Sequence, residues 1–136
     1  MNEETLQAMI SFLVYFSTGL GYLMAFGFIY IWITPHAEIK LIKNGSSAAS
    51  ISLVGAVGGY AIPLARAIQQ SHSAMDLLVW ATLALVVQII VFFALHLLIP
   101  KLSERIKNNS LAESILLAGL SLVVGLINSA SMTEYL

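Results

Sequence analysis

Few residues in this chain can do chemistry, and three of them interrupt long apolar stretches. Gln88 stands in the middle of LALVVQIIVFF, His96 follows it in the same stretch, and Asn128 lies near the end of the last one. An amide in hydrocarbon needs a hydrogen-bond partner, so we expect Gln88 and Asn128 to face another group. That partner is a neighbouring helix, a second copy of the chain or water in a solute path. His96 suits hydrogen bonding or headgroup contact, and also proton relay, because imidazole titrates near neutrality.

The acidic residues lie away from the centres of the apolar stretches. Asp76 and Glu113 fall in expected first helical turns, while Glu38 and Glu104 fall in connections. A four-helix proton-coupled exporter of the small multidrug-resistance kind needs an acid within the membrane, so this class is excluded. Paired catalytic acids and a glycine-rich phosphate loop are also missing, which indicates a non-enzymatic protein. With no cysteine, and only Glu38 beside His36 as a weak ligand pair, we expect no metal and no cofactor.

Four apolar stretches must position these side chains. Of the 136 residues, 59% are hydrophobic and 10% are charged, a composition too apolar for a soluble domain of this size. A helical span needs about 20 mostly apolar residues. This condition is met by residues 6–33, 48–64, 75–99 and 112–131. We therefore predict an all-α membrane protein with four transmembrane helices, in contact with the lipid bilayer and without a nucleic-acid partner.

The basic residues are distributed unevenly between the two sides of the predicted bundle. Five of the six lie in the first and third connections, namely Lys40, Lys43, Lys101, Arg105 and Lys107. Arg66 lies toward the other side. By the positive-inside rule, both basic connections are cytoplasmic and both termini are periplasmic. The five residues either fix this topology alone or also bind lipid headgroups or a peripheral partner.

A repeated segment suggests how the helices are organised. IKNGSSAASISLVG at 42–55 and IKNNSLAESILLAG at 106–119 are identical at nine of fourteen positions. This agreement indicates a duplicated unit of two helices joined by a basic connection. Two such units run parallel, so we expect hairpins at 1–68 and 69–136 related by an approximate two-fold axis along the membrane normal.

The residues around each repeated segment predict local structure. Ser46 and Ser110 suit the N-caps of the returning helices, with Glu113 completing a capping box at Ser110. A short helix lying in the membrane interface is expected before each segment, because apolar residues recur there at helical spacing. These residues are Ile39, Ile42, Leu102 and Ile106.

Small residues at helical spacing predict close helix packing. The glycines concerned are Gly55, Gly59, Gly119 and Gly125. Membrane helices pack through such small residues, although a pore lined by exposed backbone is the other interpretation. Because four short-looped helices enclose little interior of their own, we also expect a homo-oligomer.

One longer motif carries a family resemblance. ITPHAEIKLIKNGSSAAS at 33–50, followed by GYAIPL at 59–64, resembles the signature of the YjfL-type family of small bacterial inner-membrane proteins. The matching positions include Thr34, Pro35, His36, Glu38 and Pro63. The resemblance implies a duplicated two-helix domain, a bacterial inner membrane and a periplasmic C-terminus. It also implies membrane-stress physiology, since such proteins are often encoded beside phage-shock-type proteins.

Two functions follow as hypotheses. The first is a non-enzymatic envelope scaffold or membrane-stress component, whose basic cytoplasmic connections meet headgroups or a peripheral membrane-stress protein. The alternative is an oligomeric channel or small-solute transporter, in which Gln88 or Asn128 lines a wet path.

Overall fold

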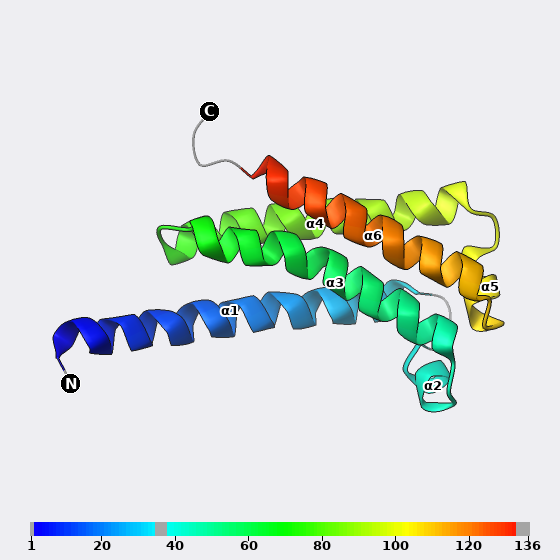
Figure 1. Ribbon diagram of the computed structural model, residues 1–136, viewed down its shortest axis with the longest axis horizontal. Coiled ribbons are helices and arrows are strands. Elements are labelled where there is room, and N and C mark those ends of the chain that lie inside the picture. Colours follow the sequence, from blue (N-terminus) through cyan, green and yellow to red (C-terminus); the bar gives the residue numbers. More distant parts are fainter. Residues whose placement is uncertain (1, 35–37, 133–136) are drawn as a thin grey trace.

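The chain folds into a helical bundle with two short helices at one end (Figure 1). The structure is a computed structural model that describes residues 2–34 and 38–132. Its helices are α1 (Glu3–Ile33), α2 (Glu38–Lys43), α3 (Ser47–Gln70), α4 (Ala74–Leu98), α5 (Leu102–Lys107) and α6 (Leu111–Ser131). Four of them, α1, α3, α4 and α6, are long and apolar enough to cross a membrane. The prediction of an all-α protein with four spans is therefore confirmed.

The second span is longer than the sequence predicted. α3 runs on past Pro63 and residue 64 to Gln70, because Ala67 and Gln70 are buried and continue its packed face. The two short helices are present where apolar spacing predicted them. Leu102 and Ile106 of α5, however, are buried against the protein and do not face the membrane interface.

The N-caps agree with the sequence at one repeated segment and differ at the other. Ser46 Oγ accepts a hydrogen bond from the Ala49 amide at 3.2 Å. At the second segment, the predicted capping box is wrong, because the Ser110 hydroxyl donates to the Glu113 carboxylate and caps no backbone amide. The other carboxylate oxygen of Glu113 accepts from Arg105. At the second segment the side chains of Arg105, Ser110 and Glu113 thus hydrogen-bond one another, whereas at the first segment the Ser46 side chain hydrogen-bonds the backbone.

The connections after α2 and α5 contain the same backbone turn. Gly45 has a φ of 86° and Asn109 a φ of 62°, which is the left-handed region that glycine and asparagine tolerate best. These residues follow helices of equal length, six residues each. The turn after α5 meets the first turn of α3, since the Ala48 amide donates to Asn109 Oδ1 at 3.0 Å. Both basic connections consequently lie at the same end of the bundle (Figure 1).

α3 is the central element and contacts each of the other five helices. Its crossing with α6 is close enough that only glycine fits at several positions. A Cβ placed on Gly55 would lie 2.2 Å from the Ala118 Cβ, and one on Gly59 would lie 2.5 Å from the Ser121 carbonyl oxygen. A Cβ on Gly125 would lie 2.2 Å from the Gly59 carbonyl oxygen. The close α3–α6 crossing therefore fixes how these two helices, and the connections at their ends, lie relative to one another.

The predicted close packing at Gly119 does not occur within the described chain. A Cβ there would meet nothing within 4 Å. The physical reason is the orientation of α6. The face that it turns toward α3 carries Ala118, one residue before Gly119, and Ala118 packs on Gly55. The glycine at the repeated position therefore points away from the crossing.

α1 is only partly packed on the bundle. Its buried residues are Gly19, Phe26 and Tyr30, all in the half nearer α2. Its 31 residues span about 46 Å at 1.5 Å per residue, which exceeds the roughly 30 Å hydrocarbon core. Figure 1 shows α1 reaching beyond the turn that joins α3 to α4. The exposed apolar side chains of α1 and α4 suit a lipid environment.

Candidate functional site

The five predicted basic residues gather at one end of the bundle, which we call the basic end. It comprises Lys40, Lys43, Lys101, Arg105 and Lys107, all exposed. They lie on or beside α2 and α5, and the turn after α5 bonds the start of α3 through Asn109 and Ala48. Arg105 Nη1 bonds Glu113 Oε1 at 2.7 Å, which offsets part of its charge. In the described chain the four lysines form no ion pair, so this end carries exposed positive charge.

Gln88 lies at the crossing of three long helices and is 3% exposed. Its Nε2 donates to the Ser121 carbonyl at 3.3 Å, and a Cβ on Gly59 would lie 3.0 Å from this nitrogen. An interhelical hydrogen bond from α4 to α6 is thus present. Gln88 Oε1 is buried and has no hydrogen-bond partner among the described residues.

Asn128 makes a second link between the same two helices. Its Nδ2 donates to the Ala84 carbonyl at 3.4 Å, and the side chain is partly buried. Because both amides bond backbone carbonyls across the α4–α6 contact, both can serve helix packing without a bound solute.

His96 links the end of α4 to the start of α5 through hydrogen bonds of its ring. Its Nδ1 lies 2.9 Å from the Phe92 carbonyl oxygen and its Nε2 lies 2.9 Å from Ser103 Oγ. A carbonyl oxygen only accepts, so Nδ1 carries a proton, and in the neutral ring Nε2 accepts from the Ser103 hydroxyl. The ring also packs on Phe92, with centroids 4.1 Å apart. This geometry places His96 in a structural contact at the basic end.

A buried polar group beside the basic end was missed by the sequence reasoning. Glu38, assigned there to a connection, is the first residue of α2 and is 0% exposed. Tyr30 of α1 and Ser52 of α3 are buried with it, and the Tyr30 hydroxyl interacts with both side chains. We call Tyr30, Glu38 and Ser52 the Glu38 cluster. The repeat contained a signal for this burial. The two repeated segments are 64 residues apart, so Leu102 is the counterpart of Glu38, and an apolar residue at the counterpart position indicates a buried position.

The other family-motif residues have structural surroundings of their own. The Thr34 hydroxyl donates to the Tyr30 carbonyl, which closes the last turn of α1. Pro63 is buried inside α3. Pro35 and His36 lie outside the described residues. Thr34 thus contacts the backbone carbonyl of Tyr30, and Glu38 interacts with the Tyr30 hydroxyl.

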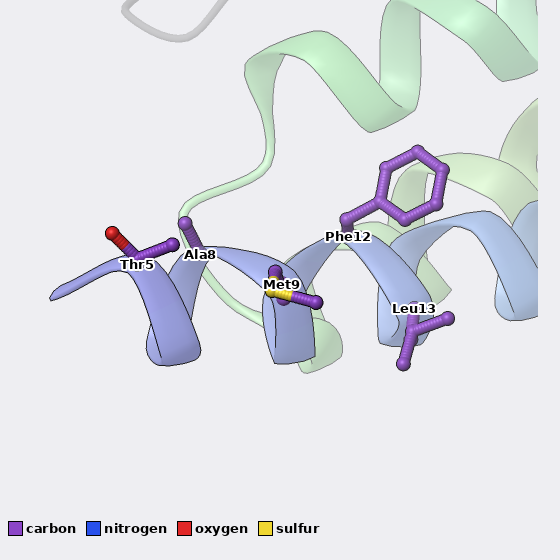
Figure 2. Close-up of a pocket in the computed structure, with 5 residues that line it drawn as sticks. All are labelled: Thr5, Ala8, Met9, Phe12 and Leu13. Carbon is purple, nitrogen blue, oxygen red and sulfur yellow. The ribbon is translucent and has the colours of Figure 1, made fainter. Parts of the chain in front are cut away.

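A shallow surface hollow occurs on α1 at the end opposite the basic end. Its lining residues are Thr5, Ala8, Met9, Phe12 and Leu13. Figure 2 shows that all five project from α1 itself, so the hollow is a gap between side chains of one helix. An apolar gap of this kind, with no second wall from another helix among its lining residues, fits acyl chains better than a recognition site.

Comparison with known proteins places these features in a family context. Residues 4–132 match the family described as Domain of Unknown Function (DUF350). The chain is 40% identical over 128 residues to the UPF0719 inner membrane protein YjfL of Escherichia coli K12, covering 94% of this chain and 97% of that protein. The protein of the same name from Escherichia coli O157:H7 matches to the same extent. No solved structure matches. The resemblance drawn from the sequence is confirmed.

Proposed function

This chain belongs to the DUF350 family, and on that premise we propose that it is a non-enzymatic scaffold or membrane-stress component of the cell envelope. It is a multi-pass membrane protein with four apolar helices, and its relatives are named inner membrane proteins. The observation that carries the proposal is the exposed positive charge of the basic end. A surface of this kind attracts anionic headgroups, at about 1 kcal/mol for each lysine or arginine near the membrane.

The proposed architecture is a pair of parallel hairpins, residues 1–68 and 69–136. Support comes from the helix bounds, because α2 begins at Glu38 and α5 at Leu102, an offset of 64 residues. Both basic connections lie at one end, which by the positive-inside rule is cytoplasmic. The two termini are then periplasmic.

The proposed assembly is a homo-oligomer with a peripheral partner. The exposed apolar faces of α1 and α4 are the surfaces through which copies of the chain would associate. A peripheral membrane-stress protein with an acidic surface would dock on the basic end, beside the headgroups. Scaffolding of this kind requires binding and no chemical step.

Headgroup binding is testable with the two tryptophans as reporters. Trp32 lies at the basic end and is 82% exposed, whereas Trp80 lies near the start of α4, at the other end. Trp80→Phe protein in phosphatidylcholine vesicles would be exposed to brominated phosphatidylglycerol or brominated phosphatidylcholine at equal mole fraction. We expect stronger quenching of Trp32 by the anionic lipid. Lys43→Gln with Lys107→Gln should lower this preference by about fivefold per lysine.

The matched controls use the opposite end of the bundle. Trp32→Phe protein, which reports from Trp80, should show no such dependence on Lys43 and Lys107, and Arg66→Gln should leave the Trp32 signal unchanged. The oligomer mass of the double lysine variant should equal that of the original protein by light scattering. Equal quenching of Trp32 by both lipids, or a preference that survives both lysine substitutions, would contradict headgroup binding.

The second candidate function is an oligomeric channel or small-solute transporter. The observation that favours it is the buried Gln88 Oε1, which has no hydrogen-bond partner among the described residues and would accept a hydrogen bond from water or solute in a conducting state. Flux through vesicles containing the protein should then fall in Gln88→Leu and Asn128→Leu. Flux that persists in both variants would remove these residues from a conducting path.

A further inference from the structure

We propose that the outer part of α1 forms a parallel coiled coil with α1 of a second copy of the chain. The outer end is the end of the bundle opposite the basic end. The contact residues, which we call the α1 seam, are Leu6, Met9, Leu13, Phe16 and Leu20. The inference rests on the proposed homo-oligomer and deepens it, because it names the helix face that joins two copies and their relative orientation.

α1 projects beyond the turn that joins α3 to α4 at the outer end (Figure 1). The rings of Tyr30 and Phe92 meet with centroids 5.1 Å apart, which gives a common level on α1 and α4. Tyr22 on α1 bonds Thr82 on α4 at 2.9 Å, so the two helices run in the same direction. From the common level to the outer end, α1 has 27 more residues and α4 has 18. At 1.5 Å per residue, α1 therefore extends about 13 Å farther than α4.

The projecting part of α1 is apolar and is not covered by the rest of the described chain. Every residue from 2 to 14 is exposed. The large apolar side chains in this part are 48–62% exposed at Leu6, Met9, Ile10, Phe12 and Leu13. α4 alone, with 25 residues, is about 37 Å long and already spans a hydrocarbon core of about 30 Å. The turns of α1 beyond α4 thus reach the headgroups and water, where exposed apolar side chains of this kind mark an interaction site.

The α1 seam has the spacing of a two-stranded coiled coil. Its five residues are separated by three, four, three and four positions, which is a seven-residue repeat with apolar residues at both core positions. Polar residues recur every seven positions on the opposite face of the helix, at Glu4, Ser11 and Thr18. α1 uses a different face within its own chain, because Gly19 is buried whereas the next residue, Leu20 of the seam, is 44% exposed. The seam is therefore open to another helix.

A second copy of the chain fits the seam in orientation and in area. Two copies in one membrane insert in the same direction, so their α1 helices are parallel and each seam residue meets its own counterpart across a two-fold axis. Burying a large apolar side chain removes roughly 60–120 Å² from solvent. The seam and its flanking residues Ile10 and Phe12, counted on both copies, then bury roughly 800–1,700 Å², which is the range of specific interfaces. Ala8, on the other flank of the hollow shown in Figure 2, lies away from the seam, so acyl chains can still fill that hollow.

Disulfide cross-linking of the full chain in native membranes tests the seam. The chain has no cysteine, so each single-cysteine variant reports one position. Met9→Cys, Leu13→Cys and Phe16→Cys should form dimers under mild oxidation at least about tenfold faster than Ser11→Cys, because only the seam brings two copies of one residue within disulfide distance. Ser11 is the matched control, since it lies between Met9 and Leu13 along the helix but on the opposite face.

A second substitution tests whether packing along the seam holds the copies together. In the Phe16→Cys protein, Leu13→Lys should lower the cross-linking rate about tenfold or more, because it places a charge in the apolar core of the coiled coil. Ser11→Lys should leave the rate unchanged. An unchanged rate in Leu13→Lys would contradict the seam.

The mass of the original protein, measured by light scattering, separates this inference from the homo-oligomer on which it rests. Cross-linking confined to the seam positions in a protein of oligomeric mass supports both. An oligomeric mass with cross-linking that is equal at positions 9, 11, 13 and 16, or absent from all four, would overturn the seam and leave an oligomer joined through another face. The mass of a single chain would overturn both proposals.

Discussion

α2 and α5 have equal lengths and are followed by the same left-handed turn, but the first residue of each helix is buried in different surroundings. Glu38 is buried with two hydroxyl side chains, whereas Leu102 is buried in an apolar group with Leu95 and Leu117. The comparison teaches that the repeated sequence specifies local backbone, while the chemistry of each interior is specific to its half.

The long helices that follow α2 and α5 differ in the same way. α3 is central, with both sides packed, and α6 packs mainly on α3 and α4. Gly55 of α3 therefore lies at a close crossing, while Gly119, at the repeated position of α6, faces open space. Position in the bundle, and not the repeated residue, decides which glycine is needed.

The largest effect should come from placing the acid of the first half into the second. Leu102→Glu puts a carboxylate into an apolar group without the Tyr30 and Ser52 hydroxyls, so we expect a loss of about 3–5 kcal/mol in unfolding free energy. Glu38→Leu is the reverse exchange and should lose much less. Circular dichroism during unfolding in mixed micelles measures both. A Leu102→Glu protein as stable as the original would mean that the two interiors are equivalent.

A smaller effect is expected from adding one methyl group at the repeated glycines. Gly55→Ala forces a Cβ against Ala118 and should cost about 1–3 kcal/mol through overpacking. Gly119→Ala meets no atom within 4 Å and should gain about 0.5–1 kcal/mol, because alanine favours the helix. The same unfolding assay compares the pair. Equal changes at both sites would show that the α3–α6 crossing is not as close as described.

The smallest effects concern the two turns. Asn109→Gly keeps the left-handed backbone but removes the acceptor of the Ala48 amide, so we expect a loss of about 0.5–1.5 kcal/mol and faster hydrogen exchange at that amide. Gly45→Asn copies the second turn into the first and should stay within about 0.5 kcal/mol of the original, since asparagine tolerates this backbone. An unprotected Ala48 amide in the original protein would contradict the contact between Asn109 and the start of α3.

The sequence predicts the elements of this fold well, and their packing only in part. Apolar runs specify the spans, and the spacing of Ile39 and Ile42 specifies a short helix, because these depend on local composition. The burial of Glu38 was missed because a charged residue between two spans is ordinarily exposed, whereas in the folded chain tertiary packing leaves Glu38 0% exposed. The open surroundings of Gly119 depend likewise on which face α6 turns toward α3.

The location of the basic end is the claim on which headgroup binding depends, and cysteine labelling measures it most directly. The chain contains no cysteine, so Lys43→Cys, Lys107→Cys and Gln69→Cys each create a single reactive site. In intact cells, an impermeant thiol reagent should label position 69, at the end of α3, and leave positions 43 and 107 unlabelled until the inner membrane is opened. Labelling of position 43 and position 107 from opposite sides, or of both from outside, would contradict a shared cytoplasmic end.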